Sequence, residues 1–154
     1  MAAKLVEQGI FLTFDEIRIL LYGLGKTKIE GVWMPEKEFT EQDVLAAMHH
    51  LSKAGFIIAR DDRFVMREDV QRIMEIAASP DDTEIWRPCG EQGPAYFLYY
   101  AGKSVVVSER FWRKKDTVRY ALFGAEEFGR IRQEYSIRET DTDQEEDTDD
   151  NSGS

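Results

Sequence analysis

Cys89 is the residue of this chain best suited to nucleophilic chemistry, and it is the only cysteine. A neighbouring cation such as Arg87 favours the thiolate form that attacks substrates. A cysteine nucleophile also needs a base, and the two histidines, His49 and His50, are far from it in sequence. We therefore expect an inert free thiol and predict no catalytic residue, so that the protein is not an enzyme.

Side chains that could hold a metal ion or a phosphate are not arranged in a binding pattern. Adjacent residues of a helix point about 100° apart, so His49 and His50 cannot share one metal ion. The segment Gly23-Leu24-Gly25-Lys26-Thr27 ends like a phosphate-binding loop, but it lacks the spacing and the preceding strand of one. We predict neither a metal nor a cofactor.

A basic and aromatic segment in the second half of the chain is the main candidate binding site. It consists of Arg110, Phe111, Trp112, Arg113, Lys114 and Lys115, with Arg119 close by. Such residues can stack on bases and neutralise phosphates, or they can anchor a protein partner, for which Trp, Phe and Arg are typical. The third interpretation is a turn whose two aromatic side chains pack on a sheet while its charges are solvated.

The net charge of −10 is concentrated at one end of the chain. Residues 139–154 contain eight acidic residues and no basic one, which leaves residues 1–138 with a net charge of −2. The segment has no apolar side chain to bury and its charges repel one another. We therefore expect a disordered acidic tail over 139–154 behind a single domain over 1–138.

Composition indicates a soluble protein of the cytoplasm. The chain is 42% hydrophobic and 32% charged, which suits a buried core under a polar surface. We find no apolar run of the roughly 20 residues that cross a bilayer, and no secretory signal at the N-terminus. A single cysteine excludes an internal disulfide framework and fits a reducing compartment. We expect no contact with a membrane.

The first predicted helix begins with a capping box, and it is one of the elements that must position the candidate binding residues. Thr13 and Glu16 have its spacing and predict a helix over 14–24, whose apolar residues recur every three or four positions. The connector that follows, over 26–39, has an apolar centre that could be a short strand or a packed loop.

A second capping box, Thr40 with Asp43, predicts a helix over 41–54. Gly55 suits the left-handed position that ends a helix, and Phe56 would then fold back on the last turn. The expected buried face of this helix consists of Val44, Leu45, Met48 and Leu51.

A hairpin and a third helix complete the first half. Asp61-Asp62 separates two short apolar runs, and aspartate tolerates the positive φ of a two-residue turn. The pattern over 68–78 predicts the helix. Residues 10–80 thus resemble a winged-helix domain, in which the second helix would read DNA and the hairpin would be the wing. Acidic residues stand where phosphates would lie, which argues against nucleic acid as the partner: Glu41, Asp43, Asp61 and Asp62.

The second half, over 81–138, is rich in strands. Aromatic and β-branched residues predict four of them, over 83–87, 95–101, 104–110 and 117–123. Their short links imply an antiparallel meander, and a helix over 125–135 follows. We therefore predict an α+β fold, with a winged-helix-like half followed by a four-stranded antiparallel meander and a C-terminal helix.

The order of these elements is similar to one half of the EspG-type proteins, the cytoplasmic chaperones of type VII secretion systems. The similarity rests on Leu12–Gly25, a capped amphipathic helix with a glycine stop, and on the meander Tyr96–Phe123 with the helix after Gly124. It covers most of residues 10–135. EspG-type proteins have two related halves, whereas this chain has the length of one, so the resemblance implies that a homodimer supplies the second half.

We therefore expect a non-enzymatic adaptor or chaperone that holds a protein client, in particular a type VII secretion substrate. The absence of a credible catalytic group and the aromatic-rich meander favour this class. The alternative is a winged-helix regulator of transcription that binds DNA.

Overall fold

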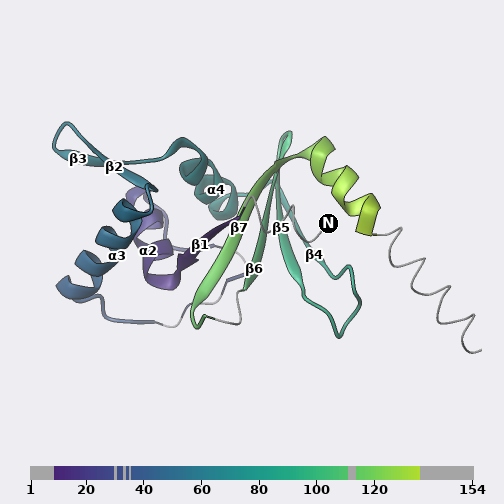
Figure 1. Ribbon diagram of the computed structural model, residues 1–154, viewed down its shortest axis with the longest axis horizontal. Helices are drawn as coiled ribbons and strands as arrows, with labels where there is room; N and C mark the ends of the chain where they lie inside the picture. The colour runs from purple at the N-terminus through teal and green to yellow at the C-terminus, as the bar shows by residue number, and fades with distance from the viewer. Residues whose placement is uncertain (1–8, 30, 33, 35, 111–113, 136–154) are drawn as a thin grey trace, which may run out of the picture.

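The fold is α+β, with one five-stranded sheet, a separate hairpin and helices on both sides of the sheet (Figure 1). The computed structural model describes residues 9–29, 31–32, 34, 36–110 and 114–135. The predicted disordered tail lies outside these residues. No helix in the described ranges is long and apolar enough to cross a membrane.

The sheet contains the predicted meander and one strand more. Its order is β1-β7-β6-β5-β4, and every pair is antiparallel. The meander consists of β4 (Asp82–Trp86), β5 (Tyr96–Ala101), β6 (Ser104–Arg110) and β7 (Thr117–Gly124). The added strand, β1 (Ile10–Thr13), pairs with β7 and places Leu12 opposite Val118.

Both capping boxes are present, and they begin the two helices at the expected residues. In α2 (Phe14–Gly23), the Thr13 hydroxyl accepts from the Glu16 amide at 3.2 Å, and the Glu16 carboxylate accepts from the Thr13 amide at 2.9 Å. The equivalent bonds join Thr40 and Asp43 at the start of α3 (Glu41–Lys53). These bonds satisfy amides that have no partner within the helix.

The end of α3 also has the predicted form. Gly55 has a φ of 78°, and the Phe56 amide donates to the carbonyl of Leu51 at 2.9 Å. This bond defines a Schellman ending. The positive φ that the ending requires at Gly55 is one that glycine adopts without strain. The described residues of the connector between α2 and α3 form no strand, so the packed loop is the correct alternative.

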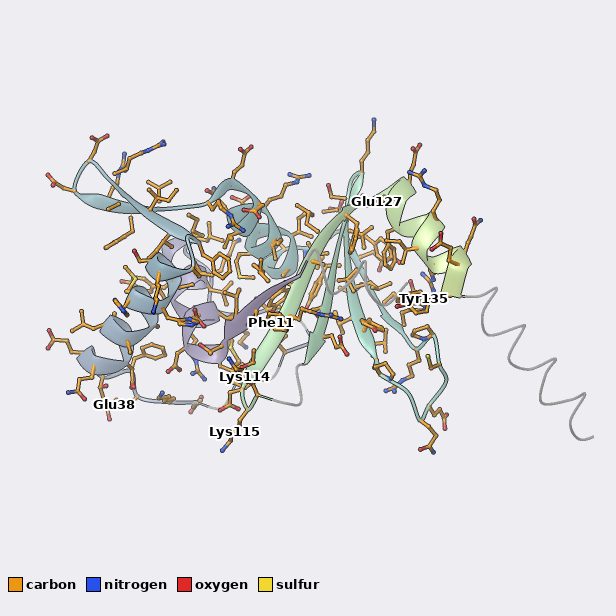
Figure 2. All side chains as sticks on the ribbon, viewed as in Figure 1. Phe11, Glu38, Lys114, Lys115, Glu127 and Tyr135 are labelled. Carbon is orange, nitrogen blue, oxygen red and sulfur yellow. The ribbon has the colours of Figure 1, made fainter. Side chains whose placement is uncertain are left out.

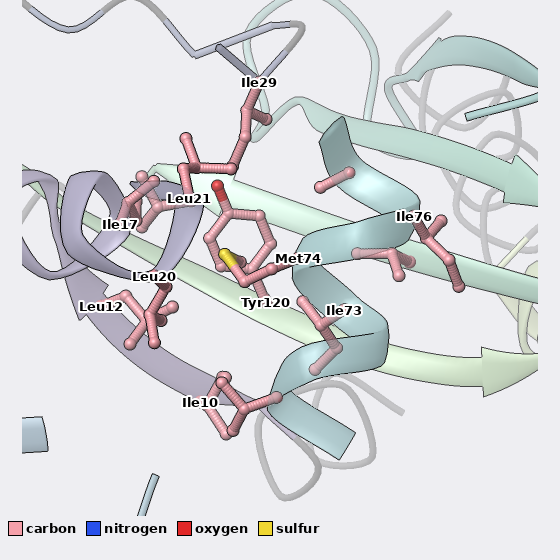
Figure 3. Close-up of a cluster of buried hydrophobic side chains, with 14 of the residues drawn as sticks. Ile10, Leu12, Ile17, Leu20, Leu21, Ile29, Ile73, Met74, Ile76 and Tyr120 are labelled. Atoms are coloured by element: carbon pink, nitrogen blue, oxygen red, sulfur yellow. The ribbon is translucent and has the colours of Figure 1, made fainter. Parts of the chain in front are cut away.

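The first core lies between the sheet and the helices α2 and α4 (Glu68–Ala78) (Figure 3). Leu20 of α2 and Met74 of α4 are fully buried against Tyr120 of β7. Leu12 of β1 joins the same cluster, which ties the start of the chain to the sheet.

The second core covers the opposite face of the sheet. The helical residues 125–135 lie there, with Phe128 and Ile131 buried and Tyr135 packed beside them, as expected (Figure 1). Trp86 of β4 and Leu98 of β5 are among the sheet residues in this cluster. Successive residues of each strand point to opposite faces, so both cores draw on the same strands.

The predicted buried face of α3 is wrong in part. Leu51 is fully buried and Met48 partly, but Leu45 is 61% exposed and Val44 is exposed as well. The reason is that α3 packs mainly on α2 and not on the sheet. A helix with one helical neighbour covers a narrow stripe, here Ala47 and Leu51, and leaves the apolar residues beside it in solvent.

Candidate functional site

An apolar slot lies at one end of the sheet, on the face that carries α2. It has a volume of about 210 Å³ and is placed where β4 and β6 end and where β5 and β7 begin. Its walls are mainly apolar, and Arg87 and Ser108 are its polar members. The apolar walls include Phe14, Val32, Ile85, Phe97 and Val118.

The slot opens beside an edge of the sheet. β4 is the last strand in the sheet order, and among the described residues it pairs with β5 alone, so one side of its backbone has no strand partner within that part of the chain. Ile85 lines the slot from this strand and is 61% exposed. An open edge with a pocket for alternate side chains is the arrangement that binds extended peptides by strand addition.

Gly31 of the connector closes the slot against the sheet. Its φ is 77°, and a β-carbon at this position would lie 2.5 Å from the ring of Phe97. The close approach and the left-handed backbone both require glycine. The Phe97 ring also packs on Tyr99, with ring centroids 4.9 Å apart.

The candidate basic segment follows β6, and its described residues Lys114 and Lys115 lie just before β7, at the same end of the sheet as the slot. Lys114 and Lys115 are exposed there (Figure 2). Arg110 ends β6. Phe111, Trp112 and Arg113 lie outside the described residues, as does the side chain of Arg110.

Arg119 is already engaged within the fold. It is buried on β7 and forms an ion pair with Glu109, its cross-strand neighbour on β6. Its charge is therefore neutralised inside the protein, and only Lys114 and Lys115 among the described members of the candidate segment present a charge to solvent.

Nucleophile and base are not brought together. Cys89 is exposed in the loop between β4 and β5, while His50 on α3 lies 2.8 Å from the buried carboxylate of Glu16. Within the described ranges, no three His, Cys, Asp or Glu side chains form a cluster that could hold a metal ion. The ring of His50 is therefore engaged with Glu16, on a different element from Cys89.

A wider groove of about 1000 Å³ runs between α2 and the connector. Tyr22, Ile29 and Met34 line it, among charged side chains of both signs. Two of its cationic side chains already form ion pairs within the protein, because Asp15 binds Arg18 at 3.1 Å and Lys37 at 2.9 Å. Its walls combine lysines with glutamates and define no ligand chemistry, so the slot at the sheet edge is the better candidate.

Acidic residues occupy the two places in the first half of the chain where a winged-helix domain would contact DNA. Asp61 and Asp62 form the tip of the hairpin with φ of 49° and 64°, which is the backbone of the predicted two-residue turn. Glu41 and Asp43 occupy the first turn of α3. These carboxylates would repel a phosphate backbone, as the sequence suggested.

An ion-pair network fixes β4 to the C-terminal helical segment. Arg132 donates to both carboxylate oxygens of Glu84, at 2.8 and 2.7 Å, and the Tyr100 hydroxyl donates to one of them at 2.7 Å. These bonds lower the pKa of Glu84 from 4.5 to about 2, with Arg132 as the largest cause. The guanidinium also lies 5.6 Å from the centre of the Trp86 ring.

We expect this network to make stability depend on pH below 5. Because the pKa of Glu84 is depressed in the folded state, its contribution is complete above the unfolded value of 4.5 and is lost as pH falls towards about 2. The pair is partly exposed, so the contribution is about 1 kcal/mol. Urea unfolding at pH 6 and pH 3 measures it.

The Arg132→Gln variant should lose this part of the pH dependence. Arg130→Gln is the matched control, because Arg130 lies exposed on the same helical segment and has no ion-pair partner among the described residues. An equal acid-induced loss of stability in both variants and in the wild type would contradict the assignment.

Comparison with known proteins adds no relative. No protein-family model matches this chain, and a search of curated proteins finds no match.

Proposed function

We propose that the protein is a non-enzymatic adaptor or chaperone of the cytoplasm that binds an extended segment of a protein client along β4. The observation that carries the proposal is the open edge of β4 beside the apolar slot. Main-chain bonds to the edge would supply affinity, and an apolar side chain in the slot would supply specificity.

The surroundings of the slot support a client with acidic residues beside its apolar anchor. Arg87 lines the slot, and Lys114 and Lys115 lie on the strand connection at the same end of the sheet. Cations around an apolar pocket steer partners of opposite charge. Because the order of elements is similar to EspG-type chaperones, we include substrates of type VII secretion among the clients.

Site-specific photo-crosslinking in the native cell tests the proposal. A photoreactive residue at Ile85 should crosslink to a client, and the same residue at Leu45 should not. The two positions are matched because both side chains are 61% exposed, yet Leu45 lies on α3, away from the sheet. Equal yields at both positions, or none at Ile85, would count against β4 as the binding edge.

A substitution in the slot distinguishes specific client binding from nonspecific crosslinking. Ile85→Lys should remove client binding by the purified protein and leave its unfolding midpoint unchanged, because the side chain is mostly in solvent. If the protein were instead a DNA-binding regulator, it would bind duplex DNA at low salt, and its affinity for DNA would fall steeply as the salt concentration rises.

A further inference from the structure

Three exposed cations lie at the end of the sheet that holds the slot. Arg87 follows β4 and lines the slot, and Lys114 and Lys115 precede β7 (Figure 2). β5 and β6 separate β4 from β7 in the sheet, which sets the two groups about 14 Å apart. None of these slot cations forms an ion pair with a described residue.

The slot cations outnumber the acidic residues beside them. The acids of the same two strand connections, 87–95 and 111–116, are Glu91 and Asp116. Glu109 at the end of β6 is neutralised by its ion pair with Arg119. This end of the sheet therefore attracts a negatively charged partner, although residues 1–138 as a whole have a net charge of −2.

The acidic tail is attached at the same end of the sheet. The helical segment 125–135 follows β7 and runs back along the sheet to the end of β4 (Figure 1). Its last residue, Tyr135, packs edge to face on Trp86, with ring centroids 5.2 Å apart, and Trp86 directly precedes Arg87. Glu139, the first acid of the tail, is four residues further on and so lies within about 15 Å of Tyr135.

We propose that the acidic tail, residues 139–154, folds back on the slot cations and covers them until a client binds. This regulation rests on the client site proposed above. The tail has eight acids to oppose the cations. At about 3.3 Å per residue its length far exceeds the distance across the sheet from β4 to β7. Attachment beside the site gives the tail an effective concentration there of about millimolar, which compensates for the weakness of exposed ion pairs.

The composition of the tail makes it a filter for clients. It consists of Asp, Glu, Thr, Gln, Asn, Ser and Gly, so it has no apolar side chain for the slot. The tail competes for the cations alone. A client that also buries an apolar side chain against Ile85 and Phe97 gains free energy that the tail cannot match. The tail thus excludes partners that are merely acidic and admits acidic segments with an apolar anchor.

A spin label on Cys89 tests the contact in the intact chain. Cys89 is exposed in the connection that carries Arg87, and it is the only cysteine, so labelling needs no substitution. The label should broaden the amide resonances of residues 139–154 at about 0.01 M salt, where the Debye length is about 30 Å. The broadening should fall at least about twofold at about 1 M salt, where that length is about 3 Å. Equal broadening at both salt concentrations would overturn the proposal.

Charge reversal identifies the site of contact. Lys114→Glu combined with Lys115→Glu should reduce the broadening at low salt as strongly as high salt does. The control, Lys53→Glu combined with Arg60→Glu, changes the net charge equally at exposed residues. These lie on α3 and on the hairpin of β2 (Ile57–Arg60) and β3 (Arg63–Met66), on the side of the molecule away from segment 125–135 (Figure 1). An equal loss of broadening in both variants would show a response to net charge alone and reject the site.

A mixed sample separates contact within one chain from contact between copies. Spin-labelled copies without isotope are mixed with isotope-labelled copies without spin label. The tail resonances should remain sharp in this mixture. Broadening equal to that of the doubly labelled chain would assign the contact to a neighbouring copy and overturn the intramolecular contact. Circular dichroism verifies that each variant is folded.

Client binding is measured separately, in a full-length variant whose tail acids are all replaced by their amides. Photo-crosslinking at Ile85 in the native cell should then yield at least about twofold more client adduct than in the wild type. An unchanged yield would overturn the competition between tail and client. Absence of any client adduct in both forms would remove the proposed function, whereas the spin label would still decide whether the tail covers the cations.

Discussion

The Trp86→Ala variant should unfold with about 3–5 kcal/mol less free energy than the wild type, the range for truncating a buried tryptophan. Trp86 is 8% exposed and joins β4 to the C-terminal helical segment. Its ring lies 5.3 Å from that of Tyr96 and meets Phe128 and Tyr135 edge to face, at 5.5 and 5.2 Å. Urea unfolding followed by far-ultraviolet circular dichroism measures the loss.

Trp86→Phe is the control for this prediction. It preserves an aromatic ring against Phe128 and leaves a smaller cavity, so its cost should be about half or less of that of alanine. A loss below about 1 kcal/mol for Trp86→Ala would show that the second core does not depend on this side chain.

The Glu16→Ala variant should lose about 2–3 kcal/mol, because one carboxylate joins three elements. Glu16 is 1% exposed. One oxygen accepts from the Thr13 amide and completes the cap of α2 at the end of β1. The other lies 2.8 Å from Nδ1 of His50, which links α2 to α3. Thermal unfolding of the purified variant measures the effect.

Glu16→Gln separates the hydrogen bonds from the charge. The amide oxygen can still accept from Thr13, and the amide nitrogen can donate to His50 in its other tautomer. We expect a loss of less than about 1 kcal/mol for this variant and for His50→Ala, whose ring is mostly in solvent. Equal losses for Glu16→Gln and Glu16→Ala would mean that the charge, and not the cap, is decisive.

Local features of the sequence predicted most elements because their causes lie within a few residues. Thr13 with Glu16 and Thr40 with Asp43 begin their helices as expected, since a capping box needs only four consecutive residues. The turn at Asp61-Asp62 followed from turn chemistry, and the strands of the meander followed from their aromatic and β-branched residues.

The sequence did not predict β1. Four residues are too few to show alternation, and the strand exists because Ile10–Thr13 pairs with β7, far along the chain. The exposure of Leu45 was also missed, since periodicity shows that a helix has an apolar stripe but not how wide a neighbour will cover it.

The features of the candidate site also fall into those that local sequence determines and those that depend on tertiary packing. The sequence by itself determined the α+β class, the helix caps and the exposed cations at Lys114 and Lys115. Only the tertiary structure decided that β4 is an edge, that Ile85 borders a slot with Phe97, and that Arg119 is held by Glu109. Caps and turns arise from bonds between near neighbours, whereas edges, slots and cross-strand ion pairs depend on which distant segments pack together.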